Sequence, residues 1–441
     1  MFWYFLRIIF SITVPTFYKK FQGRNLQRIK VKNPVLIAMN HPNAFLDAIA
    51  FSTLLHSPRT YYMARGDAFK KGFVSFVLES VGIVPIFRMR DGGIEGVKKN
   101  NQSFRRVYAM LNAGKKIMVF AEGLCMQERR LRSIQKGTAR MAFGFMEEYN
   151  NQDLLIVPVG LNYSKPEKFR SDLFYDVGEP IAVKEYYTLY KENPAKAVNA
   201  LTQEIEQRMK PLVAHLNDTK NDQLIEELQE IYKQQWIEGN KLDFDKLEHH
   251  QLYWEHIVAA LNKGDVQQPD KLERLRKAVH QYTVIVHQLK LRDHLIRSAS
   301  KEEKHLGWLK ILLLIVGFPV YRIGQLTNYT PYFISKKFAD KQCKEIEFHS
   351  SVNVVVGSFL VLVFYLLELL IVWLVFNNWW MLAVYTLVKM TSGWVSLYFS
   401  PFKKKVAGVI RLNQLKKNNN SLYQSLIQQR NEIVDIIGKL R

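Results

Sequence analysis

The stretch "MNHPNAFLDAIAF" at residues 39–51 places a histidine and an aspartate six positions apart, directly after the apolar run "VLIA". The apolar run is typical of a buried strand, and Pro42 suits the first turn of a helix. We therefore expect His41 where a strand leaves its sheet, the edge at which α/β proteins bind ligands. Asp47 would follow about a turn and a half later in a helix whose side chains lean toward its N-terminus.

A carboxylate in that position can accept a hydrogen bond from one nitrogen of the imidazole and leave the other nitrogen available. Such a pair can take a proton from a hydroxyl, with Asp47 orienting His41, and the nucleophile would then be the hydroxyl of a substrate. The same residues also fit a capped helix with an incidental histidine. This stretch alone leaves both interpretations open.

Short apolar runs alternate with helix-length stretches over residues 31–180. The runs lie at 35–39, 60–64, 82–87, 116–120, 154–161 and 173–177. This alternation predicts an α/β fold with a mainly parallel sheet covered by helices. From about residue 194 the composition changes to Leu, Gln, Glu, Lys and Arg, which predicts helices, with a turn at 262–270. A heptad-like seam on the second helix of this hairpin consists of Leu272, Leu275, Val279, Tyr282, Val286 and Leu289.

The C-terminal third of the chain contains long apolar segments. Residues 354–376 and 379–399 are each long enough to cross a bilayer, and "NN" at 377–378 leaves almost no loop between them. The run at 306–321 contains Pro319 and is expected to lie at the interface or to re-enter. Lysine clusters flank the pair on both sides, so the positive-inside rule predicts a transmembrane hairpin with both ends in the cytoplasm.

These patterns predict five regions. They are an N-terminal membrane-interface helix at 1–29, an α/β domain at 30–215, a helical hairpin region at 216–304, a membrane region at 305–400, and a basic segment with an amphipathic helix at 401–441.

The 441 residues carry a formal net charge of +22 and a pI of about 9.7. This balance suits an anionic partner, and the apolar segments favour a membrane surface over nucleic acid. The chain contains two cysteines, which imply no disulfide framework. The histidines of the 216–304 region lack the spacing of a metal site, so we expect neither a metal nor a cofactor.

Four blocks in order resemble the glycerolipid acyltransferase family, over roughly residues 30–215. They are "NHPNAFLD" from Asn40, "GIVPIFR" ending at Arg88, "VFAEG" ending at Gly123, and "IVPVGL" at 156–161. The family has four residues between its His and Asp, whereas this chain has five. The third block continues "LCMQERRLRSIQKG" instead of Thr-Arg-Ser. Both departures resemble the subset that acylates glycerol 3-phosphate.

The resemblance implies His41 and Asp47 as catalytic residues, with Arg88 gripping a phosphate and Glu122 with Gly123 beside a substrate hydroxyl. The other candidate substrate-binding residues are Asn40, Arg129, Arg130, Arg132 and Lys136. The basic run that follows Gly123 also fits an ordinary solvated loop.

The resulting hypothesis is an integral membrane acyltransferase of phospholipid biosynthesis with its active site on the cytoplasmic side. It would move a fatty acyl group from acyl-ACP or acyl-CoA to glycerol 3-phosphate. Two alternatives are open: acylation of a lysophospholipid such as 1-acylglycerol 3-phosphate, and a non-enzymatic membrane scaffold that binds lipid.

Overall fold

The computed structural model describes residues 2–87 except 56–59, 67–68 and 70–71, residues 89–299 except 151–152, and residues 308–440. The chain forms two compact units. Unit 1 comprises Met1–His215 with Cys343–Val354, and unit 2 comprises Leu216–Gln342 with Val355–Arg441. The first break coincides with the predicted boundary at 215/216. The segment 343–354, which the sequence assigns to the membrane region, instead belongs to unit 1.

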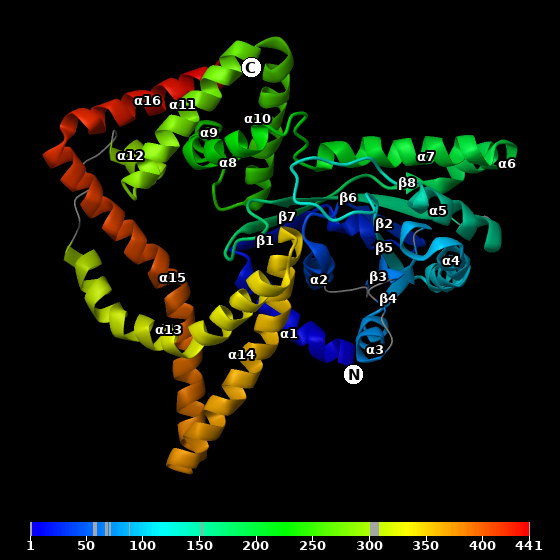
Figure 1. Cartoon of the computed structure of the whole chain (residues 1–441), viewed down its shortest axis with the longest axis horizontal. Coiled ribbons are helices and arrows are strands. Elements are labelled where there is room, and N and C mark those ends of the chain that lie inside the picture. Colours follow the sequence, from blue (N-terminus) through cyan, green and yellow to red (C-terminus); the bar gives the residue numbers. More distant parts are fainter. Residues whose placement is uncertain are drawn as a thin grey trace. The chain divides into compact units, whose positions relative to one another are not determined.

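An eight-stranded sheet forms the centre of unit 1 (Figure 1). Its strands are β1 (Lys20–Arg24), β2 (Val35–Met39), β3 (Thr60–Arg65), β4 (Ile83–Ile86), β5 (Lys116–Phe120), β6 (Leu155–Tyr163), β7 (Asp172–Val177) and β8 (Ile181–Ala182). Their order is β1-β7-β6-β2-β5-β3-β4, with β8 beside β6. The pairs β6–β7 and β6–β8 are antiparallel and the other described pairs are parallel. The predicted fold class is confirmed.

Strand β2 lies between β5 and β6, with Met39 in register with Phe120 and Val159. All five residues of β2 are buried because both faces of the sheet are covered, which explains the unbroken apolar run in the sequence. Since β2 and β5 are parallel neighbours, the residues that follow them emerge side by side at one edge of the sheet.

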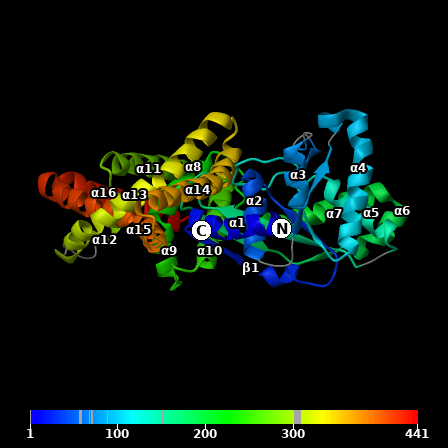
Figure 2. The same cartoon turned by 90° about the horizontal axis from the view of Figure 1, so that it is seen from below.

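Helices cover both faces of the sheet. Side chains of β2 alternate: Leu36 and Ala38 join a core with α4, α5 and α7, whereas Ile37 and Met39 join a core with α1 and α2. Figures 1 and 2 show α1 and α2 on the same side of the sheet. The helices of unit 1 are α1 (Phe2–Phe17), α2 (Ala44–Leu55), α3 (Phe73–Ser80), α4 (Met89–Asn112), α5 (Gly137–Glu148), α6 (Tyr187–Glu192) and α7 (Pro194–Met209), with 3₁₀ turns at Leu26–Ile29, Val183–Tyr186 and Lys210–Leu212.

Unit 2 is helical in its described residues. Its shorter helices are α8 (Asn221–Ile231), α9 (Lys233–Gly239), α10 (Leu247–Gln267), α11 (Pro269–Gln288), α12 (Asp293–Ala299) and α16 (Asn420–Gly438). Five of the six residues in the predicted seam of α11 are buried; Leu289 follows the helix as its C-cap. The turn between α10 and α11 is shorter than predicted, because α10 continues to Gln267 and Pro269 begins the next helix.

Three long helices follow: α13 (Trp308–Gln342), α14 (Ile346–Phe376) and α15 (Trp379–Asn418). By length and composition α13 and α14 could cross a membrane, which indicates membrane association. Helix α13 continues through Pro319 without a break, and the interfacial or re-entrant placement of 306–321 stays a prediction. The sequence predicts the second span at 379–399, which lies in α15. Among the described residues α15 does not reach the hydropathy of a candidate span. The turn at Asn377 is confirmed, with positive φ.

Within unit 2 these helices meet through small and polar residues. A Cβ on Gly324 of α13 would lie 2.1 Å from the Ser392 carbonyl oxygen of α15, so the two backbones approach closely. Lys389 of α15 forms an ion pair with Glu368 of α14 and donates to the Thr327 carbonyl oxygen at 3.3 Å. A buried charge is thereby neutralised between packed helices.

Candidate active site

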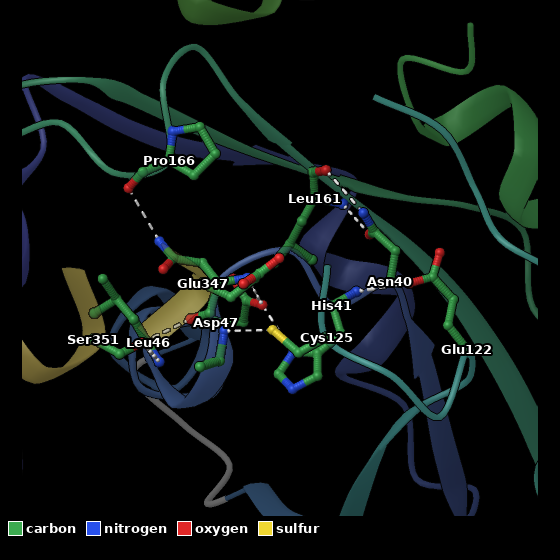
Figure 3. Close-up of polar contacts among 12 residues, drawn as sticks. Asn40, His41, Leu46, Asp47, Glu122, Cys125, Leu161, Pro166, Glu347 and Ser351 are labelled. Atoms are coloured by element: carbon green, nitrogen blue, oxygen red, sulfur yellow. Dashed lines mark hydrogen bonds and ion pairs between the residues drawn. The ribbon is translucent and has the colours of Figure 1, made fainter. Parts of the chain in front are cut away.

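His41 and Asp47 lie together at the carboxyl edge of the sheet. His41 is the second residue after β2, and Asp47 lies in the first turn of α2. The His41 Nδ1 is 2.9 Å from Asp47 Oδ2 (Figure 3). Asp47 is fully buried, whereas 17% of the His41 side chain is exposed. The contact with Asp47 uses Nδ1 and leaves Nε2 as the other ring nitrogen, whose part in proton transfer stays a prediction.

Buried hydrogen-bond donors surround the Asp47 carboxylate. Oδ2 also accepts from the Asn43 amide at 2.8 Å, and Oδ1 accepts from the Tyr163 hydroxyl at 2.5 Å. Burial, followed by the charge of Asp47, raises the pKa of Tyr163 well above its ordinary value, so this hydroxyl remains a donor. The Tyr175 hydroxyl donates to the Asp47 carbonyl oxygen at 3.1 Å. Both carboxylate oxygens thus have hydrogen-bond donors, which offsets the cost of placing this polar group in the core.

The His41 ring is fixed from its other side by β5. It stacks on Phe120, the last residue of that strand, with centroids 3.5 Å apart and planes 15° apart. The His41 carbonyl oxygen accepts from the Met126 amide at 3.1 Å. The end of β5 therefore contacts the ring of His41, and the loop after β5 holds its backbone.

Glu122 joins the two strand ends. Its carboxylate accepts from the His41 amide at 3.3 Å and the Arg132 amide at 2.9 Å. Burial raises the pKa of Glu122 to about 7, although the two amides oppose the shift. Because the folded pKa lies above the unfolded one, this group's contribution to stability is present below about pH 4.5 and is lost as the pH rises through about 7. Gly123 follows with φ +67°, a turn that favours glycine.

Asn40 holds β2 against β6. Its Oδ1 accepts from the Leu161 amide at 2.7 Å and its Nδ2 donates to the Leu161 carbonyl oxygen at 3.2 Å. The side chain is buried, and its oxygen and nitrogen both bond to the backbone of β6. The sequence suggests instead that Asn40 binds substrate. The "VPVGL" block consequently does more than pack, since it anchors Asn40 and carries Tyr163 two residues later.

The basic residues that follow Gly123 contact different partners. Arg129 donates to the carbonyl oxygens of Tyr163 and Ser164 at 3.2 and 2.9 Å and braces the end of β6. Arg130 and Arg132 both pair with Glu128. The Arg132 side chain is one-third exposed, and Lys136 is exposed at the start of α5.

Arg88 lies outside the described residues. The preceding residue, Phe87, is held by Asn100, which accepts from its amide at 2.7 Å and donates to its carbonyl oxygen at 2.5 Å. Strand β4 is parallel to β3, and β3 to β5. It therefore ends at the same edge of the sheet as His41 and Glu122.

Sequence reasoning missed three groups around this pair. Tyr163 has a signal, since it continues the alternate residues of β6 that face α2. Cys125 has none: its Sγ accepts from the Ala44 amide at 3.0 Å, and burial raises the pKa of the thiol. Asn43 is buried, and its amide reaches Asp47. Among the described residues, no three His, Cys, Asp or Glu side chains are grouped to hold a metal ion.

Comparisons with known proteins agree with the predicted family. The family model described as "Acyltransferase" matches residues 20–162. Glycerol-3-phosphate O-acyltransferase 2 of Saccharomyces cerevisiae is 23% identical over 253 residues, covering 56% of this chain and 33% of that protein. Glycerol-3-phosphate O-acyltransferase 1 of the same yeast is 24% identical, covering 57% and 33%. The chain thus spans about a third of the length of these curated relatives.

Among solved structures, the 1-acyl-sn-glycerophosphate acyltransferase of Thermotoga maritima matches 46% of this chain and 79% of its own. It has 15% identity and a TM-score of 0.31, a likeness too weak to carry an argument.

Proposed function

We propose that this chain moves a fatty acyl group from a thioester to a hydroxyl of glycerol 3-phosphate, on the premise that residues 20–162 match the family model described as "Acyltransferase". The observation that carries the proposal is the 2.9 Å contact between His41 Nδ1 and buried Asp47 at the sheet edge. The names of the two yeast relatives support the acceptor.

The chemistry follows from the protonation of one ring nitrogen. His41 Nε2 removes the proton from the acceptor hydroxyl as its oxygen attacks the thioester carbonyl carbon. The carbon–sulfur bond then breaks, and the departing thiolate takes the proton back from the imidazolium. The products are an ester and a free thiol, and His41 returns to its neutral form. Asp47 holds the ring and stabilises the imidazolium while it exists.

The phosphate of the acceptor needs cations at the same edge. We assign it to Arg88, Arg132 and Lys136. Arg129 is engaged by two carbonyl oxygens of the chain, whereas Arg132 pairs with Glu128 but keeps a third of its side chain exposed. Each carboxylate oxygen of Glu122 accepts from one backbone amide and has a second lone pair. Glu122 can therefore accept a hydrogen bond from a hydroxyl of glycerol 3-phosphate. Acyl-ACP and acyl-CoA are both anionic thioesters, so the net charge favours neither donor.

The active site is assigned to the cytoplasmic side. The segment 343–354 packs within unit 1, and Lys336, Lys337 and Lys341 come just before it in the sequence. A lysine cluster beside an apolar helix stays in the cytoplasm by the positive-inside rule. The catalytic edge of unit 1 would then be on the same side as the cluster.

The test is an acceptor and donor panel with the purified full chain in detergent. Glycerol 3-phosphate and 1-acylglycerol 3-phosphate are each offered with acyl-CoA and acyl-ACP, to wild type, Asp47→Asn and the exposed control Asp153→Asn. We expect glycerol 3-phosphate to be acylated, with Asp47→Asn slower by about 10²–10⁴-fold and the control unchanged. Acylation of the lysophospholipid alone would contradict the acceptor assignment. No thioester turnover at all would favour the scaffold.

A further inference from the structure

The first residues of α14 are part of the wall around the catalytic pair. Ser350 and Ser351 are buried, with 2% and 0% exposure, and Val354 joins the core shared by α1 and α2. The ring of Phe348 contacts Phe45 edge-on at 6.4 Å. We call residues 343–354 the α14 base.

Helix α2 begins with amides that its own turns cannot satisfy. The Asn43 amide donates to Asp47 Oδ2 at 2.8 Å, and the Ala44 amide to Cys125 Sγ at 3.0 Å. The Leu46 amide donates to Ser351 Oγ at 3.0 Å and also lies 3.2 Å from the Asn43 carbonyl oxygen. Besides Asp47 itself, two other parts of the chain therefore cap this helix: the loop after β5 through Cys125, and the α14 base through Ser351 (Figure 3).

The two serines also hold Asn43, the residue that links the turn to Asp47. Ser350 Oγ donates to Asn43 Oδ1 at 2.5 Å, and Ser351 Oγ donates to the Asn43 carbonyl oxygen at 2.8 Å. On its other side, Asn43 Nδ2 donates to the Pro166 carbonyl oxygen at 3.2 Å. A displacement of Asn43 would move its amide away from the carboxylate that orients His41.

The α14 base reaches the loop after β5 as well. Glu347 Oε1 accepts from the Gln127 amide at 3.2 Å. The neighbouring Met126 amide donates to the His41 carbonyl oxygen, and Cys125 accepts from the α2 amide described above. The α14 base thus contacts two segments beside His41: the start of α2, and the loop whose Met126 amide donates to the His41 carbonyl oxygen.

We propose that Ser350 and Ser351 are positioning residues for the His41–Asp47 pair, and that the catalytic geometry is completed by the first turns of a helix whose remainder is apolar enough to enter a membrane. The inference rests on the proposed function. Ala44 has a positive φ of 40°, a conformation unfavourable for alanine, so the turn needs such external contacts to keep its shape.

The experiment uses the full chain with Ser350→Ala, Ser351→Ala and the double variant. Removal of both hydroxyls is expected to lower kcat about tenfold, with KM for donor and acceptor within about twofold of wild type, because the loss acts on proton transfer and not on substrate contacts. The matched control is Thr202→Ala, which removes a buried hydroxyl bonded within α7, across the sheet. If the double variant keeps wild-type kcat, or if Thr202→Ala loses as much, the positioning role is wrong.

A second measurement separates positioning from general loss of structure. In an Asp47→Asn background the same serine substitutions should lower kcat by less than about twofold, since residues that act through one another are not additive. A full tenfold loss in that background would overturn the inference. Glu347→Ala removes the acceptor of the Gln127 amide at a position less buried than the serines, and a fall in kcat of about twofold to threefold is expected without change in KM; an unchanged kcat would contradict the contact's role. Failure of the proposed function would appear differently, as unimpaired transfer by Asp47→Asn itself.

Discussion

Removal of the Tyr163 hydroxyl probes how the buried carboxylate is held. Tyr163→Phe keeps the ring but leaves Asp47 Oδ1 without the donor that lies 2.5 Å away. A hydrogen bond to a charged group contributes about 1.5–3 kcal/mol, so the free energy of unfolding should fall by about that amount. Tyr175→Phe is the matched control: it removes a buried hydroxyl that reaches the Asp47 carbonyl oxygen, and such a neutral bond contributes about 0.5–1.5 kcal/mol.

Activity should separate the two variants further. Without its Oδ1 partner the carboxylate can rotate, and the bond to His41 Nδ1 loses alignment. A loss of about 1 kcal/mol of transition-state stabilisation lowers kcat about fivefold. Tyr175→Phe leaves the carboxylate untouched and should stay within about twofold. Both quantities are measured on the purified chain in detergent, by chemical unfolding and by initial rates. Equal effects of the two substitutions on stability and kcat would refute the reasoning.

Three further predictions concern Glu122, the turn at Gly123 and the orientation in the membrane. Wild type should lose up to about 3 kcal/mol of stability between about pH 5 and pH 8, and Glu122→Gln should remove that slope; a parallel slope in the variant would exclude the raised pKa of Glu122 as its source. Gly123→Ala should cost about 1–2 kcal/mol because of its positive φ, whereas Gly137→Ala, which meets open space, should be neutral; similar costs would show that backbone conformation is not the cause. An impermeant thiol reagent applied to intact cells should label Asn377→Cys and leave Lys341→Cys at the wild-type background; labelling of the lysine site would reverse the orientation.

Much of the fold could be predicted because its signals are local. The unbroken apolar run of β2 reflects a strand buried on both faces, and the six-residue step from His41 to Asp47 places the carboxylate within one helical turn of the ring. Both inferences depend only on the local geometry of strands and helices, so they can be made from the sequence alone.

Other contacts had no local signal. Ser351 reaches Leu46 across 305 positions, and Cys125 reaches Ala44 across 81. Neither residue type suggests such a partner, because a serine in an apolar helix and a lone cysteine occur in many settings. The five regions predicted from the sequence therefore placed residues 343–354 in the membrane region, although these residues pack beside α2, the helix that carries Asp47.

The membrane helices show a different limit. Pro319 predicts a break, yet α13 continues through it, since an apolar helix can lose one backbone bond where neighbouring groups compensate. The apolar residues of 379–399 predict a span, but Lys389, Thr391 and Ser392 lower its hydropathy, and Lys389 and Ser392 are buried against neighbouring helices. Whether a polar residue in such a helix is paired depends on a tertiary contact, which the sequence does not contain.

The central claim is that His41 is the general base of acyl transfer to glycerol 3-phosphate. The most direct measurement is the initial rate of ester formation by the purified His41→Ala variant at saturating substrates, beside wild type and His280→Ala, an exposed histidine of unit 2. A loss of about 10²–10⁴-fold in the His41 variant alone, with unchanged thermal unfolding, is the predicted result. Retention of more than about a tenth of the wild-type rate by a folded His41→Ala protein would contradict the mechanism.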